Sequence, residues 1–309
     1  MIDSELWVIT TYFNPLHYVR RLNNYRFFRN KLGAPLITVE LGYDGKFELG
    51  SNDADILLQI PRGHVMWQKE RLLNIALCHV PPAIKFVAWL DSDIIFEKVD
   101  WPESVIRRLK DFPIVQTFSH SCRLEQNVNS TDEFYSCKQF GQSSAYFVNK
   151  GLLAKKPIDP NVVRLRKGRV GYGWAAHRDI LDKYGFYDAM IIGGGDLVMA
   201  CAAYGWFDDA IRATSFNINQ TSHYLAWARP FFERVRGNVD YATNCIFHLW
   251  HGDIKNRRYE ARHIELANRG FNPYKDIIQN EFGCWEFTGN NADLEVFLKE
   301  YFLSRKEDG

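Results

Sequence analysis

The order of apolar and polar positions divides the first 118 residues of the chain into alternating strands and helices. Residues 6–13 (LWVITTYF) are β-branched and aromatic, which is typical of a strand, and residues 16–32 then carry the amphipathic spacing of a helix. The alternation continues with strands at 35–41, 55–60, 85–90 and 113–118 and helices at 67–80 and 102–112. Strands separated by helices predict an α/β fold, with a doubly wound, mostly parallel sheet and helices on both faces.

The second half of the chain is less regular. We expect a strand at 143–149 (SSAYFVN), a helix at 174–185 and, at 191–205, a strand, a glycine turn and a buried helix. Another apolar strand is expected at 244–252 (NCIFHLWHG). Because no repeat or linker separates the two halves, the sequence predicts a single domain. Its parts are residues 1–120, residues 121–290 and a C-terminal helical tail at 291–309.

Composition excludes several classes of protein. With 309 residues, 46% of them apolar and 15% aromatic, the chain can bury a large core, and it contains no low-complexity segment. A formal net charge of +1 provides no overall field that would attract DNA or an acidic membrane. The longest apolar runs are too short for a membrane span, and the first residues lack the basic and then apolar order of a secretion signal. These features predict an intracellular protein.

The six cysteines are scattered without a Cys-x-x-Cys pair. In an intracellular protein we expect them to be mostly reduced and buried, and Cys78 and Cys201 fall in apolar helical patterns. Cys122 and Cys137 could pair, and the sequence leaves this open.

Two acids stand where the strand at 85–90 ends. Asp91 and Asp93 are two residues apart, so both carboxylates would lie on one face of an extended segment. Ligand sites in open parallel sheets lie beyond the carboxyl ends of the strands, and two oxygen ligands there suit Mg²⁺ or Mn²⁺. In the alternative, Asp91 caps a turn and Asp93 pairs with a basic side chain. The position after a buried strand favours the metal.

Two histidines follow the apolar strand near residue 247. A neutral imidazole from His248 or His251 is a suitable third ligand for Mn²⁺, and we favour His251 because it stands beside Gly252. Gly252 would let the backbone approach a ligand closely. Lys255 and two following arginines supply positive charge for a diphosphate.

A further carboxylate, Asp196, follows the glycine turn at 193–195 and begins an apolar helix. Aspartate is a favoured helix N-cap, which explains this position without any function. Glycines at a turn also let a ligand approach the backbone closely.

These segments together resemble nucleotide-sugar glycosyltransferases of the GT-A fold that carry an Asp-x-Asp metal motif, among them poorly characterised bacterial and phage proteins. The run WLDSD (89–93) matches the metal motif, and TTYFNP (10–15), VEL (39–41) and RLLN (71–74) stand in the family's order. The resemblance extends over most of the chain. It implies a GT-A-like fold in which residues 1–120 bind the nucleotide sugar and residues 121–290 bind the acceptor.

The resemblance also implies roles for individual residues. A metal, Mn²⁺ or Mg²⁺, would be held by Asp91, Asp93 and either His251 or His248. Asp196 would deprotonate the acceptor hydroxyl, although the family has Glu-Asp or Asp-Asp where this chain has Gly-Asp. The acceptor would meet Trp174, Gly194 and Gly195. Contacts with the nucleotide sugar would come from Thr10, Tyr12, Asn14, Glu40, Arg71, Asn74, Asp91, Ser92, Gly252 and Lys255.

The sequence therefore predicts a metal-dependent glycosyltransferase of the hexosyltransferase type, in the cytoplasm of a bacterium or a phage-infected host. The donor would be a UDP-sugar and the acceptor a glycan, and the presence of one base favours inversion, with retention left open. An alternative acceptor is a 5-hydroxymethylpyrimidine in phage DNA, which basic clusters at 164–169 and 229–236 would contact. Alternatives of other classes are a nucleotidyltransferase and an inactive binding module. The sequence does not indicate the oligomeric state.

Overall fold

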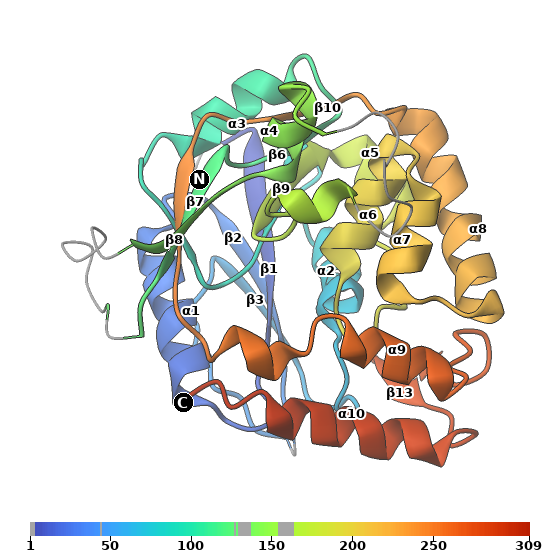
Figure 1. Ribbon diagram of the computed structural model, residues 1–309. Coiled ribbons are helices and arrows are strands. Elements are labelled where there is room, and N and C mark those ends of the chain that lie inside the picture. Colours follow the sequence, from blue (N-terminus) through green and yellow to red (C-terminus); the bar gives the residue numbers. More distant parts are fainter. Residues whose placement is uncertain (1–3, 44, 127, 129–136, 154–163) are drawn as a thin grey trace.

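The structure is a computed structural model that describes residues 4–43, 45–126, 128, 137–153 and 164–309 (Figure 1). The main sheet has seven strands in the order β10-β6-β9-β4-β1-β2-β3. All neighbours are parallel except β9, which runs antiparallel to β4 and β6. The strands are β1 (Leu6–Phe13), β2 (Leu36–Leu41), β3 (Ile56–Ile60), β4 (Phe86–Leu90), β6 (Ile114–Gln116), β9 (Gly173–His177) and β10 (Val239–Tyr241).

Helices cover both faces of this sheet, so the predicted α/β class is confirmed. Alternate residues of β1 divide the core: Ile9 packs with α2 and α6, and Val8 packs with α1 and α3. None of the helices in the described ranges is both long enough and apolar enough to cross a membrane. The helices are α1 (Val19–Lys31), α2 (Lys69–Leu77), α3 (Trp101–Leu109), α4 (Ser144–Asn149), α5 (Arg178–Tyr184), α6 (Gly195–Tyr204), α7 (Phe207–Thr214), α8 (Ile218–Val235), α9 (Ala261–Asn268) and α10 (Ala292–Ser304), with 3-10 turns η2 (Arg164–Lys167) and η3 (Ile254–Arg257).

A second sheet, in the order β5-β11-β7-β8, brings the two candidate metal segments together. Three residues separate the end of β4 from the start of β5, which pairs antiparallel with β11, with Ile94 opposite His248. The backbone N–H of Leu249 also donates to the carbonyl of Asp93, at 2.9 Å. This register places Asp93 beside the histidine segment. The strands of this sheet are β5 (Ile94–Phe96), β7 (His120–Leu124), β8 (Cys137–Gln142) and β11 (Cys245–His248), and a separate hairpin pairs β12 (Ile277–Gln279) with β13 (Trp285–Phe287).

Three of the predictions for the second half of the chain were wrong. Residues 144–149 form a helix, because the Ser143 side chain caps it by accepting from the backbone N–H of Tyr146. Residues 173–177 form a strand instead of the start of a helix, because they pair with β4 and β6. Residues 191–192 lie in a turn, and Gly193 and Gly194 follow with positive φ angles of 87° and 100°.

The cysteines also differ in part from expectation. A disulfide joins Cys122 of β7 to Cys137 of β8, which is the pairing that the sequence left open. Cys201 and Cys284 are buried thiols, as expected. Cys78 is exposed, because it follows the last residue of α2.

Candidate functional site

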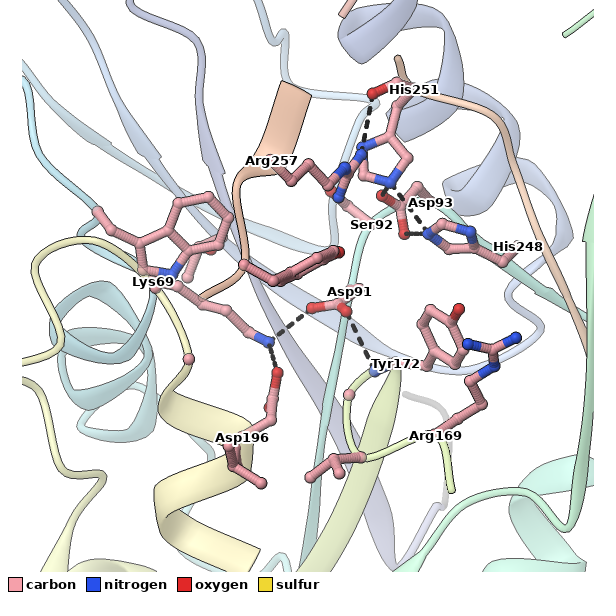
Figure 2. Close-up of a pocket in the computed structure, with 18 of the residues that line it drawn as sticks. Lys69, Asp91, Ser92, Asp93, Arg169, Tyr172, Asp196, His248, His251 and Arg257 are labelled. Carbon is pink, nitrogen blue, oxygen red and sulfur yellow. Dashed lines mark hydrogen bonds and ion pairs between the residues drawn. The ribbon is translucent and has the colours of Figure 1, made fainter. Parts of the chain in front are cut away.

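A cavity of about 450 Å³ lies beyond the carboxyl ends of β1 and β4 (Figure 2). Its lining is rich in charge, with arginines and a lysine from several different segments of the chain. The cationic residues in its lining are Arg21, Lys69, Arg123, Arg169, Arg257, Arg262 and Arg305, and the acidic ones are Asp91, Asp93, Asp196 and Glu260. A cavity with this excess of positive charge is suited to an anionic ligand.

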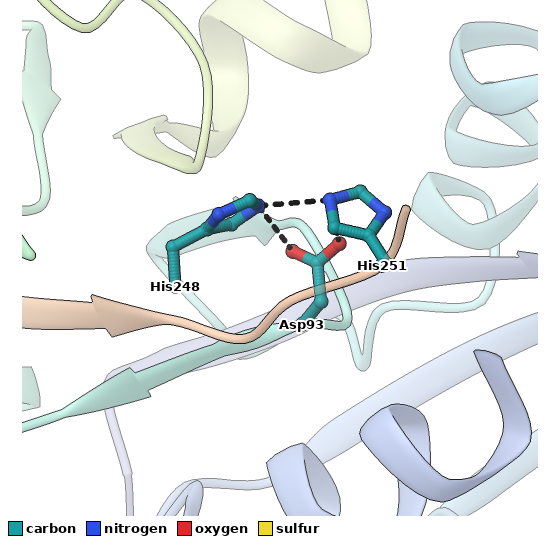
Figure 3. A group of neighbouring side chains, drawn as sticks. All are labelled: Asp93, His248 and His251. Carbon is teal, nitrogen blue, oxygen red and sulfur yellow. Dashed lines mark hydrogen bonds and ion pairs between the residues drawn. The ribbon is translucent and has the colours of Figure 1, made fainter. Parts of the chain in front are cut away.

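One wall of the cavity carries a group of three side chains, Asp93, His248 and His251, which we call the triad (Figure 3). One oxygen or nitrogen from each lies within 4.8 Å of the others. Nε2 of His251 is 3.0 Å from Nε2 of His248 and 3.2 Å from Oδ2 of Asp93. Oδ1 of Asp93 is buried and has no hydrogen-bond partner. A carboxylate that lies beside two imidazole nitrogens and has one buried oxygen without a donor fits a divalent cation.

Burial sets the protonation of the triad. It lowers the pKa of His248 and His251 well below the usual range, and the positive charge of Arg257 lowers both further. Both rings are therefore neutral near pH 7, which is the form that binds metal. Burial, together with the charge of Asp91, raises the pKa of Asp93 to about 7. A cation at the triad would keep this carboxylate ionised.

Arg257 constrains the tautomer of His251. Its guanidinium donates to Nδ1 of the ring at 2.6 Å, so the neutral ring carries its proton on Nε2, the atom that faces the triad. Coordination through Nε2 needs the proton on Nδ1 instead, and a guanidinium cannot accept it. Metal binding through Nε2 therefore requires Arg257 to leave His251.

Arginines surround the triad on two sides. On the His251 side, Arg257, Arg305 and Arg21 all add to the lowering of the imidazole pKa. Arg305 and Arg21 share the carboxylate of Glu307; although burial alone would raise its pKa, the two arginines hold it at about 2. On the His248 side lie Arg123 and Arg169. A cation at the triad would thus have guanidinium groups on both flanks.

Residues 305–308 close the cavity on the α1 side. The guanidinium of Arg305 lies over the ring of Trp67, 5.0 Å from its centroid. Asp308 accepts from the first two backbone N–H groups of α1, those of Val19 and Arg20, at 3.1 and 2.8 Å. It thereby caps a helix whose own N-cap residue, Tyr18, does not cap it with its side chain. This attachment holds Arg305 in the cavity wall.

Lys69 joins two acids in the middle of the cavity (Figure 2). Its Nζ donates to Asp91 at 2.6 Å and to Asp196 at 2.9 Å, and its side chain is only 9% exposed. Although burial opposes it, the two carboxylates raise the pKa of Lys69, so the ammonium stays charged. Burial raises the pKa of Asp196, which makes it a stronger base than an exposed aspartate.

The glycine turn places Asp196 at the cavity. Gly194 is in the left-handed region and lines the cavity, whereas Gly195 begins α6 against the carboxyl group of Glu70, with which a Cβ there would collide. Glu70 is buried, and burial raises its pKa to about 8.

Asp91 and Asp93 do not share a face, so that part of the prediction was wrong. β4 ends at Leu90, and residues 91–93 make a turn before β5, so the alternation of a strand does not apply to them. Asp91 points to Lys69 and to the backbone N–H of Tyr172, while Asp93 belongs to the triad. Ser92 also lines the cavity.

The first strand contributes less to the cavity than the sequence predicts. Thr10 lines it and donates to the carbonyl of Leu90, at 2.7 Å. The lining does not include Tyr12, Asn14 or Glu40, because their polar atoms hold the segment around Glu48. Tyr12 and Asn14 donate to the Glu48 carboxylate, and Glu40 accepts from the backbone N–H groups of Glu48 and Leu49.

Arg71, Asn74 and Trp174 are also structural in this arrangement. Arg71 and Asn74 both donate to the carboxylate of Asp188, at 2.9 and 3.0 Å, and so fix the segment before the glycine turn. Trp174 is 3% exposed and donates to the carbonyl of Val170, so its ring packs in the core and does not line the cavity that holds the triad.

Gly252 and Lys255 line a neighbouring cavity of about 520 Å³ on the far side of His251. Gly252 lies against the backbone of residues 305–307, and a Cβ there would be 2.9 Å from the carbonyl oxygen of Lys306. The close approach that this glycine permits is therefore to the chain itself. Lys255 is 80% exposed and lies 3.4 Å from Asp253.

Sequence reasoning missed Lys69, Arg21, Arg123 and Arg305. Lys69 stands in the first turn of α2, after a strand, where a side chain can reach the carboxyl edge of the sheet, and this position was a usable signal. No local pattern marks Arg21, Arg123 or Arg305, because separate elements bring them together only in the folded chain.

No protein-family model matches the chain, and no curated protein sequence does. Among solved structures, the chain is similar to glucosyl-3-phosphoglycerate synthase from Mycobacterium tuberculosis, in complex with Mn²⁺, UDP and glucosyl-3-phosphoglycerate. That similarity has 12% identity and a TM-score of 0.42 and covers 92% of this chain and 87% of that one. The chain is also similar to 4-diphosphocytidyl-2C-methyl-D-erythritol synthase from Anaerococcus prevotii, with 10% identity and a TM-score of 0.34, over 78% of this chain and 87% of that one. What those enzymes bind is a property of those enzymes, and at these values nothing follows for the site of this chain.

Proposed function

We propose that this protein is a metal-dependent glycosyltransferase that moves a sugar from a nucleoside diphosphate sugar, of the UDP type, to a hydroxyl group of a saccharide. The observation that carries the proposal is that one cavity holds the triad, the arginines on its His251 side and a separate, partly buried base. A diphosphate needs the first two, and transfer to a hydroxyl needs the third.

Asp93, His248 and His251 would hold Mn²⁺ or Mg²⁺, which supplies positive charge against the two phosphates of the leaving group. Arg257 and Arg305 line the same wall and would stabilise the additional negative charge that develops on the departing diphosphate. Ser92 lies in the turn between the two acids and faces the same region.

Asp196 would accept the proton of the acceptor hydroxyl. It lies on the Lys69 side of the cavity, whose lining also includes Gly194. Lys69 would hold both Asp196 and Asp91 in place, and Asp91 would contact the transferred sugar. Since Asp196 provides a base outside the triad, we propose inversion at the anomeric carbon.

A glycan is proposed as the acceptor ahead of DNA. In the second basic cluster, Arg234 pairs with Asp179 at 3.2 Å and Arg236 with Glu233 at 3.4 Å. These surface arginines are balanced by acids and offer little charge to a phosphate backbone.

Calorimetric titration of UDP in the presence of Mn²⁺, and again with EDTA, tests the donor site. We expect metal-dependent binding that Asp93→Asn weakens roughly a hundredfold or more. Asp253→Asn, which removes an exposed acid from the segment after the triad, is the matched control and should bind as wild type does. Equal binding with Mn²⁺ and with EDTA would contradict the proposal. Mass spectrometry with a panel of nucleotide sugars and saccharides then identifies the donor and acceptor.

A further inference from the structure

Arg123 and Arg169 form a second cationic group in the cavity, on the His248 side of the triad. Arg123 lies on β7 and Arg169 lies in the segment before β9. The ion pairs of the described residues include no acid for either guanidinium group. Arg305 and Arg21 differ in this respect, because they share Glu307. Two neighbouring guanidinium groups without an acid are costly unless a ligand supplies negative charge.

Both side chains are held in position by the protein. Nε of Arg123 donates to the hydroxyl of Tyr172 at 2.9 Å, and Tyr172 is itself fixed through its backbone N–H on Asp91. The side chain of Arg169 crosses β8 at Gly141, where a Cβ would be only 2.6 Å from its Nε. Figure 2 shows Arg169 and Tyr172 side by side. Such support is typical of a binding group and unlike that of a freely solvated surface arginine.

The segment that carries Arg169 and Tyr172 also reaches Asp196. Gly171 lies in the same segment as Arg169 and Tyr172, and a Cβ at Gly171 would be 3.3 Å from Asp196 and 3.7 Å from Asp91. The segment therefore runs from the base to the arginine pair. A sugar ring next to Asp196 would therefore lie along the segment that carries Arg169.

The charge of the donor does not account for this pair. The two charges of a nucleotide-sugar diphosphate are matched by a divalent metal, and Arg257 already stands next to the triad. The charge of Arg123 and Arg169 thus remains available for another anion.

We infer that Arg123, Arg169 and the hydroxyl of Tyr172 form a subsite for a carboxylate or phosphate group on one of the two sugars in the reaction. This rests on the proposed function. The group belongs either to the transferred sugar, as in a uronic acid, or to the acceptor. Tyr172 accepts from Arg123, and its own hydroxyl proton can be donated to the anion.

Two arms of one experiment separate the sources. The donor arm compares UDP-glucuronate with UDP-glucose in calorimetric titrations with Mn²⁺. The acceptor arm compares glucuronate and glucose 6-phosphate with glucose in transfer assays. In one arm, wild type should prefer the anionic compound by roughly tenfold to a hundredfold. Arg123→Gln and Arg169→Gln should lose most of that preference while keeping their affinity for UDP. Arg123→Lys and Arg169→Lys should retain part of the preference.

Two further variants make the test specific. Gly141→Ala keeps both charges but displaces the Arg169 side chain, so it should reduce the preference too. Arg234→Gln removes an exposed arginine outside the cavity and should behave as wild type.

If UDP binds and neither arm shows a preference for the anionic compound, the subsite is overturned and the proposed function still stands. Failure of UDP to bind would instead count against the proposed function. Inorganic phosphate then decides the subsite: it is supported if wild type and Arg234→Gln bind phosphate and Arg169→Gln does not, and overturned if all three behave alike.

Discussion

Replacing Lys69 by Met would leave two carboxylates in the cavity without their shared cation. The Lys69 ammonium lies 2.6 Å from Asp91 and 2.9 Å from Asp196 on a side chain that is 9% exposed. The side chains of its two partners are 27% and 21% exposed, so water reaches each of them in part. We therefore expect Lys69→Met to fold and to be less stable than wild type.

The size of the loss follows from this exposure. Removing one partner of a fully buried ion pair costs about 3–5 kcal/mol in the free energy of unfolding. Partial solvation of both acids reduces the expected loss to roughly 2–3 kcal/mol near pH 8.

The loss should also depend on pH. Burial already raises the pKa of Asp196, and removing Lys69 raises it further. An acid with a raised pKa in the folded protein keeps a proton that the unfolded chain has released, so stability falls as the pH rises past the ordinary value of 3.8. The deficit of Lys69→Met should therefore be smaller near pH 5 than near pH 8.

Urea unfolding followed by tryptophan fluorescence at both pH values measures the effect. Lys85→Met is the matched control: Lys85 lies 2.7 Å from Glu5 at the surface, and its loss should not be measurable. Adding Asp196→Asn to Lys69→Met should recover part of the stability. A deficit that is equal at the two pH values, or no larger than that of Lys85→Met, would refute the reasoning.

The remaining predictions concern the surroundings of the triad. Glu70→Gln should be more stable than wild type near pH 8.5 and equal to it near pH 4.5. The pKa of the buried Glu70 is raised from 4.5 to about 8, so the stability of wild type falls as the pH rises between these two values. Urea unfolding across this pH range measures the difference, and a difference that does not change with pH would contradict the prediction. Arg257→Gln should bind Mn²⁺ alone roughly tenfold more tightly than wild type, since His251 is then free to change tautomer, and it should bind Mn²⁺-UDP more weakly. Calorimetry measures the two affinities. If both affinities change in the same direction, Arg257 does not have this role. Asp308→Ala should lower the free energy of unfolding in urea by about 1 kcal/mol, because it removes the cap of α1. It should also weaken UDP binding, because Arg305 is then held less firmly. An unchanged UDP affinity would show that residues 305–308 do not support the site.

Much of the parallel half could be predicted from sequence because its strands are continuous apolar runs between amphipathic helices. β4 is such a run, and its position predicted where the acids would stand. The second half depends more on pairing between distant segments. Residues 173–177 have a helical pattern on their own, and only their pairing between β4 and β6 makes them a strand.

The site divides in the same way. Asp93 and the two histidines could be selected from sequence because each follows an apolar strand. The divergence of Asp91 from Asp93 could not be predicted, because it depends on where β4 ends. Gly252 had a visible reason to be a glycine, but its neighbour proved to be the backbone of residues 305–307, some fifty residues further along the chain. Long-range contacts of this kind leave no local pattern.

The most direct test of the central claim is an anomalous diffraction map from a crystal grown with MnCl₂ and UDP. We predict a manganese peak within coordinating distance of Asp93, His248 and His251, in contact with the diphosphate of UDP, and with Arg257 moved off His251. UDP bound in the cavity with no manganese at the triad, and with Arg257 still on His251, would contradict the account.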